Sequence, residues 1–191
     1  MARPVDHEKR AELLAEVVEY LDRHGVAELS LRKAGAELGT SARMLVYYFG
    51  TKEALVAEAL ASTRPDVDTY FDAADDHEGL LAIALATWGE MVRGRQRRGV
   101  RLLLETMSLA ARPKHPHRPF AVEQVQVWVG PLTTAFERLG HPHADAEARA
   151  TALVSGLRGL ALDRYVTRDP HRTDAAARTL IEAVIAERVP H

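Results

Sequence analysis

Apolar residues recur along the chain at spacings of three and four, and no stretch alternates apolar and polar residues as a half-buried strand does. Leu13, Val17, Val18 and Leu21, for example, fall on one face of a helix. The pattern predicts an all-α fold of about nine helices. The expected ranges are 6–24, 31–38, 42–49, 51–60, 77–94, 100–111, 120–139, 144–167 and 173–189, with a short helical piece at 66–74.

Two glycines divide the N-terminal helices. Gly39 and Gly50 follow the second and third predicted helices, and glycine enters left-handed turn geometry without steric cost. Ser30, Ser41 and Thr51 stand where a side-chain oxygen caps the next helix. A helix, a short turn with glycine and a second helix form a helix-turn-helix, whose second helix enters the DNA major groove.

Helical periodicity alone also allows an ordinary helical hairpin with core aromatics, but the order of residues in this stretch is more specific. The relevant residues are Gly39-Thr40-Ser41, then Leu45, Tyr47, Tyr48 and Phe49, then Lys52-Glu53-Ala54-Leu55. This series resembles the N-terminal DNA-binding domain of the TetR family of transcriptional regulators. Val46 departs from the family pattern, which often has tyrosine there. The motif covers about a quarter to a third of the chain.

The resemblance implies a helix-turn-helix DNA-binding domain at 1–52 and a helical effector-binding and dimerisation domain at 53–191. It implies a ligand-responsive repressor that a small apolar effector releases from a palindromic DNA operator. Dimerisation is expected through the last two helices, where Gly156 and Gly159 permit close approach between subunits. The alternative is that these two helices pack only within one subunit.

Arg43 is the expected base-reading residue, because its guanidinium can pair with O6 and N7 of guanine. Helical spacing places Arg43 and Tyr47 on one face, and Leu45 and Phe49 on another as core anchors. Neighbouring side chains are expected to contact phosphates, sugars or thymine methyls. The predicted DNA-binding residues are Arg32, Lys33, Thr40, Ser41, Ala42, Arg43, Met44, Tyr47, Tyr48 and Lys52.

Net charge gives no general attraction to DNA. The formal charge is −2, and residues 1–52 hold eight Lys/Arg and eight Asp/Glu. The helix-turn-helix itself has only Glu37 against its four basic residues, which favours a local basic face rather than a basic domain. Further along, five arginines at 93, 95, 97, 98 and 101 form either a solvated helix end or a second phosphate-contacting patch.

Two residues leave alternatives open. Gly35, inside the second predicted helix, is either a tolerated imperfection or the mark of a close approach to the third helix. Glu105 lies on an apolar helix, where a carboxylate needs a partner, so it is expected to accept a hydrogen bond from a ligand or to pair with an arginine.

Large apolar residues in the second half are candidates for an effector pocket, although as residue types they also suit an ordinary core. The family resemblance favours the pocket. The predicted ligand-binding residues are Trp88, Met91, Leu103, Glu105, Met107, Trp128 and Leu132.

Other classes of function find little support in the sequence. No cofactor or metal is expected: the His115-Pro116-His117 and His141-Pro142-His143 segments lack completing ligands, and cysteine is absent. A protein-interaction module, or a small helical enzyme with an apolar pocket, remains as an alternative. We expect a cytoplasmic protein, because no membrane span or signal region is present.

Overall fold

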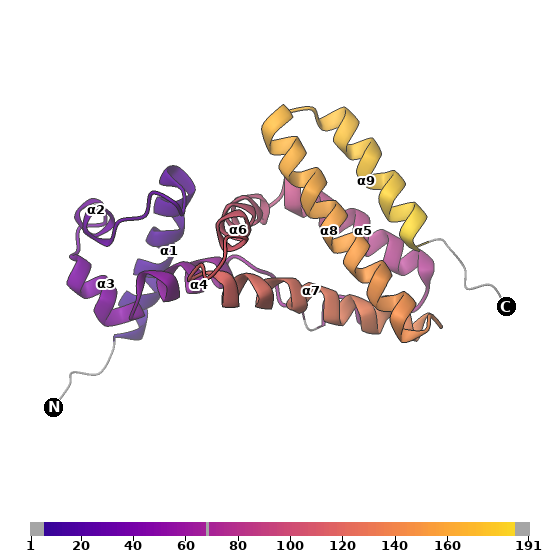
Figure 1. The fold of residues 1–191 in the computed structure, drawn as a ribbon, viewed down its shortest axis with the longest axis horizontal. Helices are drawn as coiled ribbons and strands as arrows, with labels where there is room; N and C mark the ends of the chain where they lie inside the picture. Colours follow the sequence, from indigo (N-terminus) through magenta and orange to yellow (C-terminus); the bar gives the residue numbers. More distant parts are fainter. Residues whose placement is uncertain (1–5, 68, 186–191) are drawn as a thin grey trace. The chain divides into compact units, whose positions relative to one another are not determined.

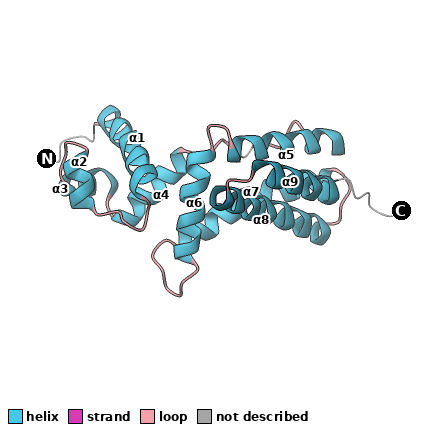
Figure 2. Cartoon of the chain, turned by 90° about the horizontal axis from the view of Figure 1, so that it is seen from above, coloured by secondary structure: helices cyan, strands magenta, loops and turns pink. Residues whose placement is uncertain are grey.

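The computed structural model describes residues 6–67 and 69–185, and within them it contains nine helices and no strand (Figures 1 and 2). The predicted all-α fold is confirmed for this part of the chain. The helices are α1 (His7–His24), α2 (Leu31–Glu37), α3 (Ala42–Phe49), α4 (Lys52–Ser62), α5 (His77–Val92), α6 (Arg97–Ala110), α7 (Arg118–Arg138), α8 (His143–Thr167) and α9 (Pro170–Ile185).

Most helix ends lie within two residues of the prediction, and the differences have local causes. α6 begins three residues early, at Arg97, and α9 begins at Pro170, because proline suits the first turn of a helix. The predicted end of α9 at 189 lies outside the described residues. The short helix predicted at 66–74 is wrong for the described residues of that range, which exclude residue 68: the backbone hydrogen bonds there join Tyr70 to Val67, Asp72 to Thr69 and Ala74 to Phe71, and none of these residues is helical.

The chain forms two compact units. Unit 1 comprises residues 1–64 and 102–121, and unit 2 comprises residues 65–101 and 122–191. The chain passes from one unit to the other three times: after residue 64, within α6 and within α7. The predicted functional boundary at residue 52 lies inside unit 1 and stays a prediction.

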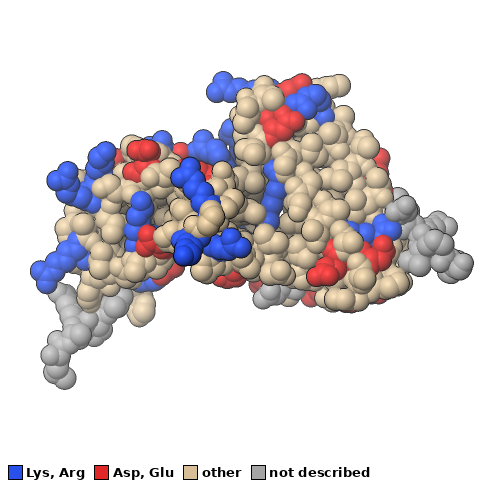
Figure 3. All heavy atoms as spheres, in the orientation of Figure 1, with Lys and Arg blue, Asp and Glu red and all other residues tan. Residues whose placement is uncertain are grey.

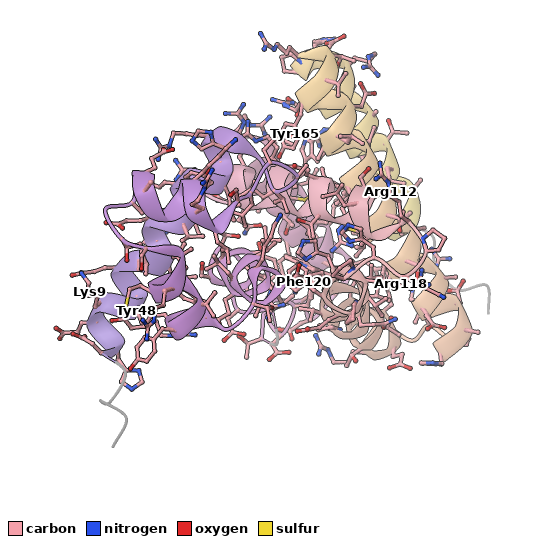
Figure 4. All side chains as sticks on the ribbon, turned by 60° about the vertical axis from the view of Figure 1, so that its left-hand side comes forward. Lys9, Tyr48, Arg112, Arg118, Phe120 and Tyr165 are labelled. Atoms are coloured by element: carbon pink, nitrogen blue, oxygen red, sulfur yellow. The ribbon has the colours of Figure 1, made fainter. Side chains whose placement is uncertain are left out.

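Unit 1 has a core to which all of its helices contribute. α1 packs against α4, and α3 packs against both α2 and α4. Leu21, Leu45, Leu55 and Leu102 are almost completely buried in this core, and Phe120 packs against it (labelled in Figure 4). The recognition-helix candidate α3 is therefore held by side chains from well-separated parts of the sequence.

Unit 2 is built around α5, α8 and α9, which contact one another. Leu80, Phe136 and Ile181 are fully buried there. The buried side chain of Arg158, on α8, donates a hydrogen bond of 2.7 Å from Nη2 to the backbone oxygen of Gln124 on α7. None of the helices in the described ranges has the length and apolar character needed to cross a membrane.

Candidate nucleic-acid interface

The turn between α2 and α3 and the end of α3 have the geometry that the glycines predict. Gly39 and Gly50 have φ angles of +63° and +77°, in the left-handed region. Ser41 Oγ accepts from the backbone N–H of Met44 at 3.2 Å, and Thr51 Oγ1 caps α4 in the same way at 3.0 Å. Both predicted caps are confirmed.

Ser30 is an exception among the predicted caps. Its backbone has the extended conformation of an N-cap residue, but its side chain makes no capping hydrogen bond. The N-terminus of α2 is therefore set by the backbone and by the buried Leu29 rather than by the serine hydroxyl.

Gly35 marks the close approach of α2 to the start of α3. A Cβ atom at this position would lie 2.8 Å from the backbone carbon of Ser41 and 2.9 Å from the backbone nitrogen of Ala42. Both distances are shorter than van der Waals contact, and a backbone cannot move aside as a flexible side chain does. The interpretation of Gly35 as a packing requirement is confirmed.

α3 has one buried and one exposed face. Leu45 and Phe49 are 1% and 4% exposed, which confirms them as core anchors. Tyr47 and Val46 are 47% and 46% exposed, and Arg43 is exposed beside them. An apolar side chain exposed to this extent on a short helix is typical of a contact surface rather than a core.

Arg10, on α1, holds the C-terminal end of α3 in place, a role that sequence reasoning missed. Its Nε donates to the backbone oxygen of Tyr48 at 3.2 Å, and its guanidinium lies 5.0 Å from the centre of the Phe49 ring. It also forms an ion pair with Glu58 on α4. No spacing rule connects residues 38 and 48 positions apart, so the sequence carries no signal of this role.

The predicted DNA-binding residues gather on α2, α3 and the two turns that flank α3. Arg32 and Lys33 are exposed on α2, whereas Tyr48 and Lys52 are half-buried. Figure 3 shows Lys and Arg side chains along the outer edge of the α2–α3 region. Their contacts with DNA stay predictions.

Glu37, the acidic residue of the helix-turn-helix, contacts basic side chains of α1. Glu37 forms an ion pair with Arg23, at 2.8 Å, and its carboxylate lies 3.1 Å from Nε2 of His24, both on α1. Its negative charge is thereby paired locally, and the basic residues of α2 and α3 are left to set the potential of the exposed face.

A family comparison decides what this unit is. The sequence profile described as "Bacterial regulatory proteins, tetR family" matches residues 13–59, which span α1 from Leu13 to the greater part of α4. Residues 13–59 therefore carry the N-terminal domain of the tetR family. Members of this family are DNA-binding regulators, and the match includes the whole helix-turn-helix, with α3 in the position of the recognition helix. No curated protein matches the sequence significantly.

Solved structures of similar fold include two repressors of multidrug efflux pumps. NalD of Pseudomonas aeruginosa, the secondary repressor of the MexAB-OprM pump, is 20% identical with a TM-score of 0.71, over 95% of this chain and 97% of its own. SmeT of Stenotrophomonas maltophilia, the repressor of SmeDEF, is 17% identical with a TM-score of 0.71, over 93% and 88%. The multidrug binding protein EbrR, complexed with proflavin, is 26% identical with a TM-score of 0.62, over 92% and 99%.

The residues predicted to bind the effector are divided between the two units of the chain. Trp88, Met91, Trp128 and Leu132 belong to unit 2, whereas residues 103, 105 and 107 belong to unit 1. Trp88 is buried, and its Nε1 donates to Asp174 at 2.7 Å. Membership of a single ligand site stays a prediction for this set.

Glu105 has a different partner from the two that were expected. Its Oε1 accepts a hydrogen bond of 2.9 Å from the backbone N–H of Ala27, in the turn after α1. Gly25, with a φ angle of +82°, leaves room for this carboxylate, since a Cβ there would lie 3.0 Å from Oε1. Glu105 thus fastens α6 to the α1–α2 turn inside unit 1.

The two His-Pro-His segments have separate surroundings. His141 and His143 make 2.7 Å contacts with different carboxylates, Asp145 and Glu137. His117 is buried, and burial together with the neighbouring His115 lowers its pKa. Within the described ranges, no three or more His, Asp or Glu side chains are grouped so that they hold a metal ion.

Proposed function

We propose that this regulator is a dimeric repressor that binds a palindromic operator through α3 and leaves it when a small apolar effector binds. The proposal rests mainly on the exposed face of α3, which carries Arg43, Val46 and Tyr47. The opposite face is buried through Leu45 and Phe49. Arg43 reads a guanine, and Tyr47, Tyr48 and Lys52 contact phosphates.

The repressor and effector parts of the proposal draw on similar proteins. NalD and SmeT are repressors, and EbrR was crystallised with proflavin. In this chain, unit 2 offers the large side chains of Trp88, Met91, Trp128 and Leu132. The effector shifts the equilibrium only if it binds one arrangement of the units better than the other.

The face of α8 that remains exposed supports the dimer. Leu153, Leu157 and Ala161 are buried, and Gly156 admits Leu180 of α9, so these residues pack within the subunit. The remaining face carries small and apolar residues, namely Ala152, Ser155, Gly159, Leu162 and Val166, all of them exposed. We assign this face to a second copy of the chain.

Selection of bound sequences from a random DNA pool tests the proposal. We expect one enriched palindrome whose half-sites are centred about 34–36 Å apart, the spacing of two recognition helices in a two-fold dimer. The DNA upstream of the protein's own coding region serves as a second template. A pool without enrichment after repeated rounds contradicts operator binding.

Salt dependence separates this proposal from the protein-interaction alternative. A regulator that neutralises several phosphates loses affinity steeply as salt concentration rises, because counterions are released on binding. We expect a clear negative slope of log K against log salt concentration for the enriched site. A protein-interaction module gives no DNA binding on which such a slope can be measured.

A further inference from the structure

Unit 2 contains a basic pocket where α5 and α8 end and α6 and α9 begin. Its volume is about 530 Å³, within the usual range for small-molecule sites. The basic pocket is lined by Val92, Arg93, Arg97, Arg101, Arg164, Tyr165, Arg168 and Pro170. Five of the eight lining residues are arginines and none is acidic, so the pocket carries a concentrated positive charge.

The charge of the basic pocket is only partly balanced. Asp174, on α9, accepts from Arg93 at 2.8 Å and from Arg164 at 2.7 Å, so one carboxylate serves two guanidinium groups. Within residues 6–67 and 69–185, Arg97 and Arg168 have no carboxylate partner. Like charges held close together repel, and a bound anion relieves that repulsion.

Hydrogen bonds of Tyr165 hold together the helices that surround the basic pocket. Its hydroxyl donates to the backbone oxygen of Met91 at 2.6 Å and approaches that of Arg97 at 3.3 Å, which ties α8 to the end of α5 and the start of α6 (labelled in Figure 4). Burial raises the pKa of Tyr165 to about 12, against the opposing effect of the nearby arginines. The phenol therefore stays protonated and keeps donating at physiological pH.

The walls of the basic pocket combine charge with apolar surface. Val92 is 4% exposed, and Pro170 begins α9 at the rim. A guanidinium presents donors in a planar fork that matches the oxygens of a carboxylate or a phosphate. An apolar wall beside such forks suits a ligand that has an anionic group on a hydrocarbon body.

We propose that the basic pocket binds a small organic anion, whose carboxylate or phosphate group is held by Arg97 and Arg168 and whose apolar part lies against Val92, Tyr165 and Pro170. The site differs from the apolar effector site, since of the residues predicted there none lines this pocket. A concave pocket of this size also suits a small molecule better than the phosphate backbone of a duplex, which requires an open surface.

Calorimetry on the full-length chain at low salt tests the proposal with four probes. Benzoate and phenyl phosphate carry the two anionic groups on the same ring, benzamide has that ring without a charge, and inorganic phosphate has the charge without the ring. We expect saturable binding of benzoate or phenyl phosphate, and at least about tenfold weaker binding of benzamide and of phosphate. Which of the two aromatic anions binds better identifies the preferred group.

Variants locate the binding. Arg97→Gln combined with Arg168→Gln is expected to weaken binding of the better probe by at least about tenfold, because each loses a charge-assisted hydrogen bond. Arg95→Gln removes the same charge two residues before Arg97, but Arg95 does not line the pocket, so its effect is expected to stay within about twofold. Circular dichroism confirms that each variant is folded.

Three results overturn the proposal: no saturable binding of either aromatic anion, equal binding of benzamide, or equal weakening by Arg95→Gln. Loss of DNA affinity in the double variant, without any binding of small anions, assigns the arginines to DNA phosphates instead. The binding measurements with small anions use no operator, so they test this proposal independently of the proposed repressor function.

Discussion

Gly35 is the residue at which α2 and the start of α3 come closest, and the contact opposes helix propensity. Propensity alone favours Gly35→Ala by about 1 kcal/mol. We expect the reverse, a loss of about 1–3 kcal/mol in the free energy of unfolding, because the new methyl group meets backbone atoms of Ser41 and Ala42. Urea unfolding followed by circular dichroism measures the difference.

Gly89→Ala is the matched control. Gly89 also lies inside a helix, but a Cβ there meets only the end of the Arg93 side chain, at 3.7 Å, an ordinary contact. We expect it to leave stability unchanged or to raise it by up to about 1 kcal/mol. The same sign of change for Gly35→Ala and Gly89→Ala rules out the close approach as the reason for Gly35.

Glu105, one of the predicted ligand-binding residues, also makes a hydrogen bond within unit 1. Replacing it by alanine leaves the N–H of Ala27 without the carboxylate, so we expect faster hydrogen exchange at that amide and a loss of about 1 kcal/mol in stability. Glu105→Gln keeps an acceptor oxygen and should show a smaller change. An exchange rate at Ala27 that is unaffected by Glu105→Ala contradicts the assignment.

At the scale of elements, the carboxylate of Asp174 joins α9 to α8 through an ion pair with Arg164, and its charge depends on pH. Burial alone raises the pKa of Asp174, but hydrogen bonds from Trp88 and Arg93 and the charge of Arg164 hold it below its ordinary value of 3.8. The unfolded chain therefore binds this proton more readily than the folded chain. The stabilisation is present above about pH 4 and is lost as pH falls through the lower, folded-state value.

We accordingly expect the stability of the protein to rise with pH in the acid range up to about pH 4, and Asp174→Asn to flatten that rise. Asp75→Asn, which removes an exposed carboxylate ahead of α5, serves as the control. Urea unfolding at a series of pH values measures both. A slope in Asp174→Asn as steep as in the wild type contradicts the role given to Asp174.

Helix positions were predictable from the sequence because caps, glycines and apolar periodicity are local signals. Ser41, Thr51 and Gly39 fix the boundaries of α3 and α4 through neighbours only three or four residues away. Partners across the fold were not predictable. Arg10 meets Tyr48 and the side chain of residue 105 meets Ala27 only after the helices pack, and no periodic pattern encodes that packing.

The same difference between local signals and contacts across the fold applies to the dimer face of α8. Leu153 and Leu157 lie four residues apart on one apolar face of α8, but they are buried within the subunit, in which α9 packs along α8 (Figure 1). A second subunit can contact only the face of α8 that stays exposed. Sequence alone did not reveal which of two apolar faces that is.

At the scale of the whole molecule, the exposed face of α8 predicts the oligomeric state. Leu162 is 50% exposed and Val166 is 74% exposed, and because they lie four residues apart on α8 they form one continuous apolar patch. We expect Leu162→Glu combined with Val166→Glu to convert a dimer to a monomer in analytical ultracentrifugation, because charges are then buried against one another.

Val122→Glu is the control for the dimer, since Val122 is similarly exposed, at 52%, but lies on α7. It should leave the dimer intact. A wild-type protein that sediments as a monomer at micromolar concentration, or a double variant that remains dimeric, contradicts the assignment of this face.

The affinity of the enriched operator for the Arg43→Ala variant tests the central claim most directly. Fluorescence anisotropy with the operator and with single-base variants measures affinity and base preference together. We expect Arg43→Ala to cost about 1–3 kcal/mol and to relax preference at one position of each half-site, whereas Arg112→Ala, an exposed charge elsewhere in unit 1, changes neither. Wild-type affinity with unchanged base preference in Arg43→Ala would contradict the assignment of this face of α3 to base recognition.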